Sequence, residues 1–157
     1  MSARRANAGR RRGTTRALAA LALALLVAAC GPVPGGTLAG RVAPLPDAWS
    51  SKVRQPSFCE VESRPRDPHS IQLECFVDAE DLYVQSHRWA LAPWWPATSW
   101  AEIWLAEPDV RVRLGDELFE LRAVRETDAA RRERILRARG YDPVPDGIVL
   151  FRFEPRG

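Results

Sequence analysis

The sequence is poor in the residues and motifs that commonly mark an enzyme's active site. Its 157 residues include one lysine, Lys52, together with two histidines and three cysteines. It contains no Walker loop, no GxGxxG run and no motif around a nucleophilic serine or cysteine. These absences exclude a phosphate-loop nucleotide site, a Rossmann dinucleotide fingerprint and the hydrolase motifs as starting points for a function.

Long apolar runs are also scarce, and the single clear one lies near the start of the chain. ALAALALALLVAA, Ala17 to Ala29, follows six arginines and ends at Cys30. A bilayer span takes about 20 apolar residues, whereas a cationic segment followed by a shorter apolar run is typical of a secretory signal. Val27 to Cys30 resembles the lipobox of bacterial lipoproteins.

The resemblance to a lipobox implies the domain organisation. We expect residues 1–29 to be a lipoprotein signal peptide, residues 30–36 a lipidated tether of glycine and proline, and residues 37–157 one folded domain. Lipid on Cys30 would anchor this domain to a membrane of the bacterial cell envelope, facing the periplasm or the cell exterior.

Loss of the leader also changes the net charge. The whole chain carries +3, but the six arginines of residues 1–29 leave with no acidic residue. The remaining 17 basic and 20 acidic side chains give −3. The basic character of the whole chain therefore comes from the leader and does not support nucleic-acid binding by the domain. We predict no nucleic-acid partner.

The other two cysteines are predicted to form a disulfide. Strand-like runs flank the turn RPRDPH, and a hairpin with Ser63 opposite Ile71 places Cys59 opposite Cys75. Directly opposed residues have Cβ atoms roughly 4.5 to 5.5 Å apart, which is close to disulfide geometry. Because the domain is expected to be exported, it would lie in a compartment where a disulfide between these cysteines can persist.

The two histidines suggest an alternative use for these cysteines. In this alternative His69 and His87 complete a zinc site with Cys59 and Cys75, but the spacings match none of the usual ligand patterns. We therefore predict no metal site.

A second hairpin, at Gly115-Asp116, has a register that can be counted from its turn. Glycine in the first position of a two-residue loop suits a type II′ turn. Counting back from it pairs Val112 with Phe119, and Arg111 with Glu120. Apolar residues then face apolar residues, and opposite charges face each other.

The remaining pattern predicts a mainly β domain with two helices. One helix begins at Thr98 or Ser99 and ends at Pro108, and the other runs from the cap at Thr127 or Asp128 to Gly140. Further strands are expected at 37–42, 82–86 and 148–153, the last buried on both faces. Six or seven short antiparallel strands with two helices favour a small closed or half-closed β-barrel.

The order of these elements resembles the split β-barrel proteins of the pyridoxamine-phosphate-oxidase-like and deazaflavin-dependent nitroreductase group. In that group a strand ending in a Ser/Arg-rich turn precedes a tryptophan-containing helix, a hairpin and an Arg/Glu-rich helix. The resemblance runs from about Ser57 to Phe153. The residues of this chain that match the pattern of the group are Ser86, Arg88, Trp100 or Trp104, Leu105, Pro108, Val110 and Val112.

The resemblance implies a homodimer with FMN or a deazaflavin bound in a groove between subunits. Ser86 and Arg88 would then hold the phosphate, because a hydroxyl and an arginine fork supply convergent donors. A protonated His87 would assist them, and Trp100 would stack on the flavin ring. The chain departs from the group because it has no lysine near this turn, and the bulky apolar segment 89–95 is a poor neighbour for a phosphate.

Two hypotheses follow. We favour a cell-envelope lipoprotein whose split barrel is a non-catalytic binding or structural module for an unspecified small molecule or partner. The alternative is an FMN- or deazaflavin-dependent oxidoreductase that uses the Ser86 and Arg88 turn. Stacking of Trp94, Trp95 or Trp100 on a planar ring would favour the alternative, whereas we expect these tryptophans to pack in a core or an interface.

Overall fold

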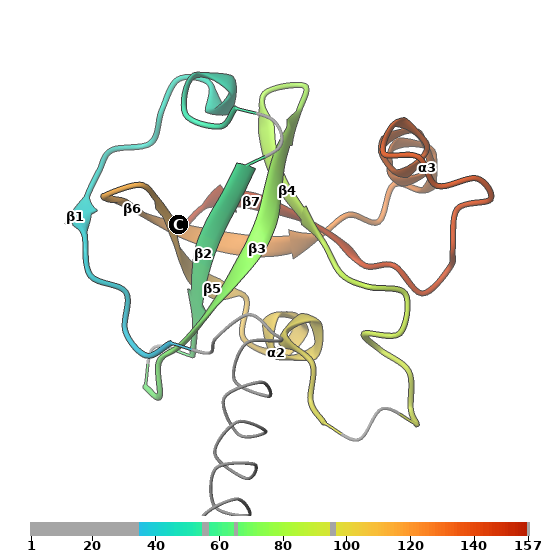
Figure 1. Ribbon diagram of the computed structural model, residues 1–157, viewed down its shortest axis with the longest axis horizontal. Coiled ribbons are helices and arrows are strands. Elements are labelled where there is room, and N and C mark those ends of the chain that lie inside the picture. The colour runs from blue at the N-terminus through green and yellow to red at the C-terminus, as the bar shows by residue number, and fades with distance from the viewer. Residues whose placement is uncertain (1–34, 55–56, 65, 95–96, 157) are drawn as a thin grey trace, which may run out of the picture. The chain divides into compact units, whose positions relative to one another are not determined.

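The structure, a computed structural model, describes residues 35–156 except 55–56, 65 and 95–96. The strands form one seven-stranded sheet, and Figure 1 shows one helix below the sheet and another beside it. The elements in chain order are β1 (Arg41–Val42), η1 (Trp49–Ser51), β2 (Ser57–Ser63), β3 (His69–Asp78), β4 (Asp81–Gln85), α2 (Trp100–Ala106), β5 (Asp109–Leu114), β6 (Glu117–Arg125), α3 (Ala129–Ala138) and β7 (Leu150–Pro155).

Six of the strands close into an antiparallel barrel. The strand order is β1-β6-β5-β2-β3-β4-β7, and an additional pairing of β6 with β7 joins the two ends. The short β1 lies outside this ring and runs parallel to β6. The mainly β barrel with two helices that the sequence predicts is therefore confirmed.

The hairpin of β5 and β6 has the register counted from the sequence. Val112 pairs with Phe119, and Arg111 pairs with Glu120. Gly115 has a φ of 60°, which costs glycine little because it has no Cβ. The alternation therefore places Val110, Val112 and Phe119 in the core.

The register predicted for the cysteine hairpin was wrong by two residues. Ser63 lies opposite His69, and Cys59 lies opposite Leu73. The turn is tighter than predicted, because Arg64 adopts a φ of 54° and its carbonyl accepts a hydrogen bond from the Asp67 amide at 2.9 Å.

The disulfide nevertheless forms. A shift of two residues keeps every side chain on its own face of the sheet, so Cys59 and Cys75 become diagonal neighbours with Cα atoms 5.8 Å apart. This separation lies within the range that a disulfide spans, and both cysteines are buried in the core.

The predicted strand at 37–42 is confined to Arg41 and Val42. Upstream of them, side chains take the place of a ladder: Glu62 accepts the Leu38 amide at 2.5 Å, and Arg113 donates to the Ala39 carbonyl at 3.0 Å. We call residues 35–43 the N-terminal strap. Its first residue, Gly35, exchanges two backbone hydrogen bonds with Ser70, each 2.8 Å long.

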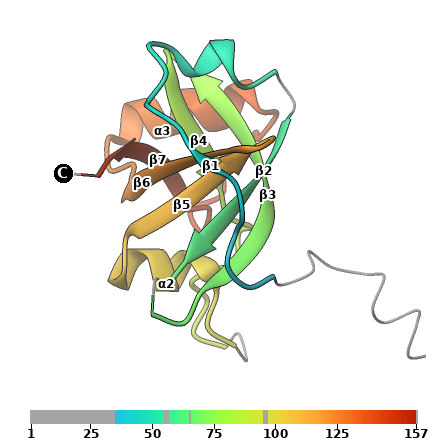
Figure 2. The same ribbon diagram turned by 90° about the vertical axis from the view of Figure 1, so that its left-hand side faces the viewer.

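Both predicted helices form, with the predicted caps. Ser99 and Glu102 make a capping box at the start of α2, and Asp128 caps α3. Pro108 follows α2 directly after its C-cap residue, which is consistent with its role in ending the helix. Figure 2 shows α2 at one end of the barrel, whereas α3 lies against its side.

The core fills the barrel with aromatic and branched side chains. Trp104 of α2 lies 5.4 Å from Phe151, and Trp49 meets Phe119 edge-on at 5.2 Å between ring centroids. A second cluster outside the barrel joins Ile135 of α3 to Leu150 of β7. Strand β7 is thus buried on both faces, as its sequence predicts, although it begins at 150 rather than at 148.

The predicted signal peptide, most of the tether and the lipid site at Cys30 lie outside the described residues. In the part that the structure describes, no helix is long and apolar enough to cross a bilayer.

Candidate functional site

The turn after β4 contains three of the predicted site residues, and the first of them faces inward. Ser86 is only 2% exposed. Its amide donates to the Val149 carbonyl at 2.9 Å, and its Oγ accepts the Val149 amide at 2.8 Å. The hydroxyl donates in turn to the His87 carbonyl at 3.0 Å. Ser86 therefore continues the ladder between β4 and β7, and its hydroxyl proton is used within the chain.

The next two residues are exposed. The Nδ1 atom of His87 accepts the Trp89 amide at 3.2 Å. The Arg88 guanidinium lies over the Trp89 ring, 4.2 Å from its centroid. Among the described residues Arg88 forms no ion pair. The three residues share one turn, but the Ser86 hydroxyl is buried while the Arg88 side chain lies at the surface.

The backbone of this turn is held by a close approach from the segment before β7. A Cβ placed on Gly147 would lie 2.0 Å from the Arg88 carbonyl oxygen, so only glycine fits there. The approach keeps the turn packed against residues 147–149.

The fourth predicted site residue, Trp100, belongs to the core packing. Its ring lies 4.5 Å from Trp104 and 5.9 Å from Phe151 between centroids. For Trp100 we considered stacking on a planar cofactor and packing in the core, and these ring contacts are those of core packing. Trp94, by contrast, is 64% exposed, and Trp95 lies outside the described residues.

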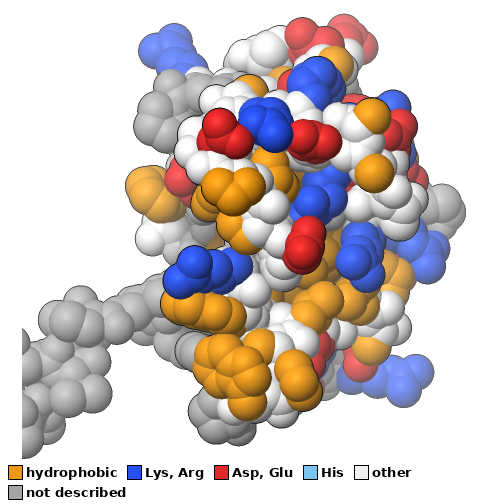
Figure 3. Space-filling view, turned by 90° about the vertical axis from the view of Figure 1, so that its right-hand side faces the viewer, with side chains coloured by type: hydrophobic (Ala, Val, Ile, Leu, Met, Phe, Trp, Pro, Cys, Tyr) orange, Lys and Arg blue, Asp and Glu red, His pale blue; other side chains and the backbone are white. Residues whose placement is uncertain are grey.

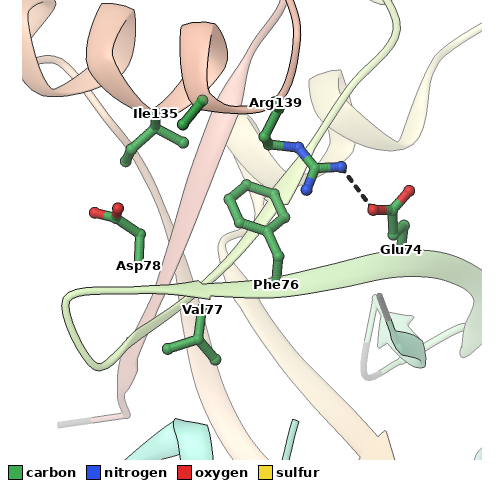
Figure 4. Close-up of a pocket in the computed structure, with 7 residues that line it drawn as sticks. Glu74, Phe76, Val77, Asp78, Ile135 and Arg139 are labelled. Atoms are coloured by element: carbon green, nitrogen blue, oxygen red, sulfur yellow. Dashed lines mark hydrogen bonds and ion pairs between the residues drawn. The ribbon is translucent and has the colours of Figure 1, made fainter. Parts of the chain in front are cut away.

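A pocket of about 430 Å³ lies between β3 and α3, away from this turn. Figure 4 shows Phe76 at its floor with the Arg139 guanidinium beside it, reaching toward Glu74. The guanidinium stacks on the Phe76 ring at 4.0 Å and donates to Glu74 and Gln85 at 2.7 and 2.6 Å. The arginine is therefore already neutralised and hydrogen-bonded.

The other end of this pocket is also charge-paired. Arg134 donates two hydrogen bonds of 2.7 Å to the Asp78 carboxylate. This bidentate contact holds the pKa of Asp78 below its ordinary value, against the opposing effect of partial burial. The pocket thus presents paired charges around one aromatic face and offers no unpaired carboxylate or cation to a ligand.

A second pocket, of about 380 Å³, lies beside the N-terminal strap. Glu62 is 5% exposed there, and its carboxylate receives two hydrogen bonds from Arg111, of 2.9 and 2.7 Å. The bond to Glu62 raises the pKa of Arg111. This pair ties the strap to β2 and β5, and we assign it a structural role.

Metal ligands do not gather in the described part of the domain. No group of three or more histidine, cysteine, aspartate or glutamate side chains is placed to hold an ion there. Cys59 and Cys75, the cysteines of the zinc alternative, are joined to each other.

Sequence reasoning missed the inward direction of Ser86, the pairing of Glu62 with Arg111, and the β3 to α3 pocket. Strands β2 and β5 are about 50 residues apart in the sequence, and no turn fixes their register. The sequence therefore does not predict which charged side chains of the two strands lie opposite each other. One feature of the sequence could have predicted the inward direction of Ser86. It ends a strand, where a side-chain hydroxyl often replaces a ladder partner.

No known family model and no curated protein matches the sequence. Solved structures do match. A protein of Listeria innocua, described as a candidate pyridoxamine 5′-phosphate oxidase, is 19% identical over 68% of this chain and 90% of its own, with a TM-score of 0.52. The chain has the split β-barrel fold. A NimC/NimA family protein of Clostridium acetobutylicum is 14% identical over 66% of this chain and 77% of its own, with a TM-score of 0.47.

A FAD-binding protein of Mesorhizobium loti is 15% identical over 69% of this chain and 85% of its own, with a TM-score of 0.46. At identities this low, the likeness to the Listeria protein establishes the fold and leaves activity to be argued from the site.

The Ser86 hydroxyl should matter for stability. Ser86→Ala leaves the buried Val149 amide without its acceptor, so we expect the free energy of unfolding to fall by about 1 to 3 kcal/mol. Urea denaturation measures the change. Ser50→Ala removes an exposed hydroxyl and serves as the control, with an expected effect within about 0.5 kcal/mol. Equal stability of Ser86→Ala and the parent chain would show that this hydrogen bond is not formed.

The Asp78 carboxylate should contribute to stability only while it is ionised. Because its pKa is lowered in the folded state, its contribution is fully present above the unfolded pKa of about 4 and is lost as pH falls through the folded pKa. Asp78→Asn should therefore be less stable than the parent chain at pH 7, and the difference should shrink below about pH 4.

Thermal denaturation over a pH series measures this difference. Asp67→Asn is the matched control, because the Asp67 side chain is 86% exposed and its ion pair with Arg64 is 3.8 Å long, so a smaller effect is expected. A gap between Asp78→Asn and the parent chain that stays constant from pH 7 to pH 3 would contradict the assignment.

Proposed function

We propose that this protein is a lipoprotein of the bacterial cell envelope, anchored through Cys30, whose split-barrel domain is a non-catalytic binding or structural module. The observation that carries the proposal is the state of the Ser86 hydroxyl. It accepts from Val149 and donates to His87, so it has no proton left for a phosphate oxygen.

The chemistry of phosphate binding explains how this observation supports the proposal. A doubly charged phosphate in a protein needs several convergent donors, because its desolvation must be offset. With Ser86 turned inward, this turn retains Arg88 as its cation, and that guanidinium lies over an exposed indole ring. The single lysine of the chain, Lys52, donates to Glu117 at 2.5 Å. Lys52 therefore does not replace the lysine that members of the split-barrel group carry near this turn.

An FMN- or deazaflavin-dependent oxidoreductase is the second candidate. The fold favours it, and so does Arg88, which is exposed and forms no ion pair within the described ranges. The homodimer that the family resemblance implies belongs with this candidate, since the flavin groove lies between subunits in that group. Ser86 would then have to break its bond to Val149 before it could bind a phosphate.

Flavin binding separates the two candidates. We expect the detergent-solubilised full chain, titrated with FMN or a deazaflavin, to show no absorption change up to about 1 mM, which corresponds to a binding free energy weaker than about 4 kcal/mol. A yellow protein whose colour is lost in Arg88→Ala and retained in Arg66→Ala would overturn the proposal. Arg66 is an exposed arginine of the β2–β3 turn and is the matched control.

A further inference from the structure

The connection from β4 to α2 exposes two large aromatic side chains. We call residues 86–94 the tryptophan loop. Trp89 is 44% exposed and Trp94 is 64% exposed, and their ring centroids lie 6.2 Å apart. Exposed indole rings placed together indicate a surface that meets another phase or partner, because each ring keeps apolar area in contact with water.

Hydrogen bonds to the backbone of Ala90 hold the neighbouring Trp89 ring at the surface. The Ser99 hydroxyl, which also caps α2, donates to the Ala90 carbonyl at 2.6 Å. The Ala90 amide bonds the His87 carbonyl at 3.1 Å, and Ala90 is 1% exposed. The loop is therefore fixed to the barrel at its centre, and the outward position of Trp89 follows from this packing.

The exposed surface combines apolar rings with a cation. Arg88 stacks on Trp89 at 4.2 Å, so a guanidinium borders the aromatic area. Figure 3 shows hydrophobic side chains gathered at the lower end of this face, with basic side chains beside them. Indole rings bordered by an arginine suit the interface of a bilayer, where rings lie at headgroup level and cations meet lipid phosphates.

The tether brings this loop close to a membrane. Gly35 is fixed to Ser70 by two backbone hydrogen bonds, and it stands five positions after Cys30 in the sequence. Five residues span at most about 17 Å when fully extended. A lipid on Cys30 would therefore hold the start of β3 within that distance of the bilayer surface.

The tryptophan loop leaves the barrel at the same end. Strand β3 begins at His69, next to Ser70, and β4 runs antiparallel to it and ends at Gln85. Figures 1 and 2 both show the loop, α2 and the β2–β3 turn at the lower end of the barrel. The anchor point and the exposed rings thus share one end of the domain.

We propose that the tryptophan loop docks on the bilayer that holds the Cys30 lipid. Trp89 and Trp94 enter the headgroup region, and Arg88 pairs with lipid phosphate. This inference rests on the proposed function, because lipidation of Cys30 sets the distance to the membrane. Docking would fix the orientation of the barrel, with α2 toward the membrane and the opposite end toward the aqueous compartment.

Quenching by brominated lipid tests the proposal. The full chain is reconstituted into vesicles of phosphatidylglycerol and phosphatidylcholine, with or without bromine near the top of the acyl chains. We expect tryptophan emission to be quenched in the brominated vesicles. In Trp89→Ala/Trp94→Ala the quenching should fall about twofold or more, because Trp49, Trp100 and Trp104 pack in the core away from lipid.

Phe58→Ala is the matched control. Phe58 is 68% exposed and lies at the start of β2, at the other end of that strand from the β2–β3 turn, so its loss should leave quenching unchanged. Intact mass of the purified protein reports the lipid on Cys30. A lipidated chain whose emission is the same in both kinds of vesicle would overturn docking alone, whereas a chain without lipid would overturn both docking and the proposed function.

Discussion

Strand β7 forms ladders with both β4 and β6, and this double pairing closes the barrel. Without β7 the remaining five barrel strands would be an open sheet, with β4 and residues 121–125 of β6 at its unpaired edges. Its own residues make the closure stable, because Phe151 points into the core while Leu150 lies under α3. Strand β7 therefore contributes to both the inner and the outer packing of the domain.

Closure by β7 also decides the chemistry of the neighbouring turn. The ladder between β4 and β7 continues beyond Gln85 through Ser86, whose amide and hydroxyl both bond Val149. Gly147 then packs against the carbonyl of Arg88. The turn after β4 thus takes part in closing the barrel, and the exposed part of the same connection presents indole rings and one arginine.

Local rules predicted much of the fold. The glycine turn set the register of β5 and β6, and Ser99 and Asp128 capped the helices as expected, because each signal acts within a few residues. Long-range features escaped prediction, such as the inward turn of Ser86 and the pairing of Glu62 with Arg111. Both depend on strands far apart in the sequence. Trp94 was expected to pack in a core or an interface, and it is 64% exposed on the barrel, outside the core.

The most direct test of the account is amide hydrogen exchange at Val149, measured by NMR with and without about 1 mM FMN. The bond from the Val149 amide to the Ser86 hydroxyl predicts slow exchange, at the rate of the flanking β7 amides, that FMN leaves unchanged. Fast exchange at Val149, or a rate that changes on addition of FMN, would contradict the claim that Ser86 is committed to barrel closure.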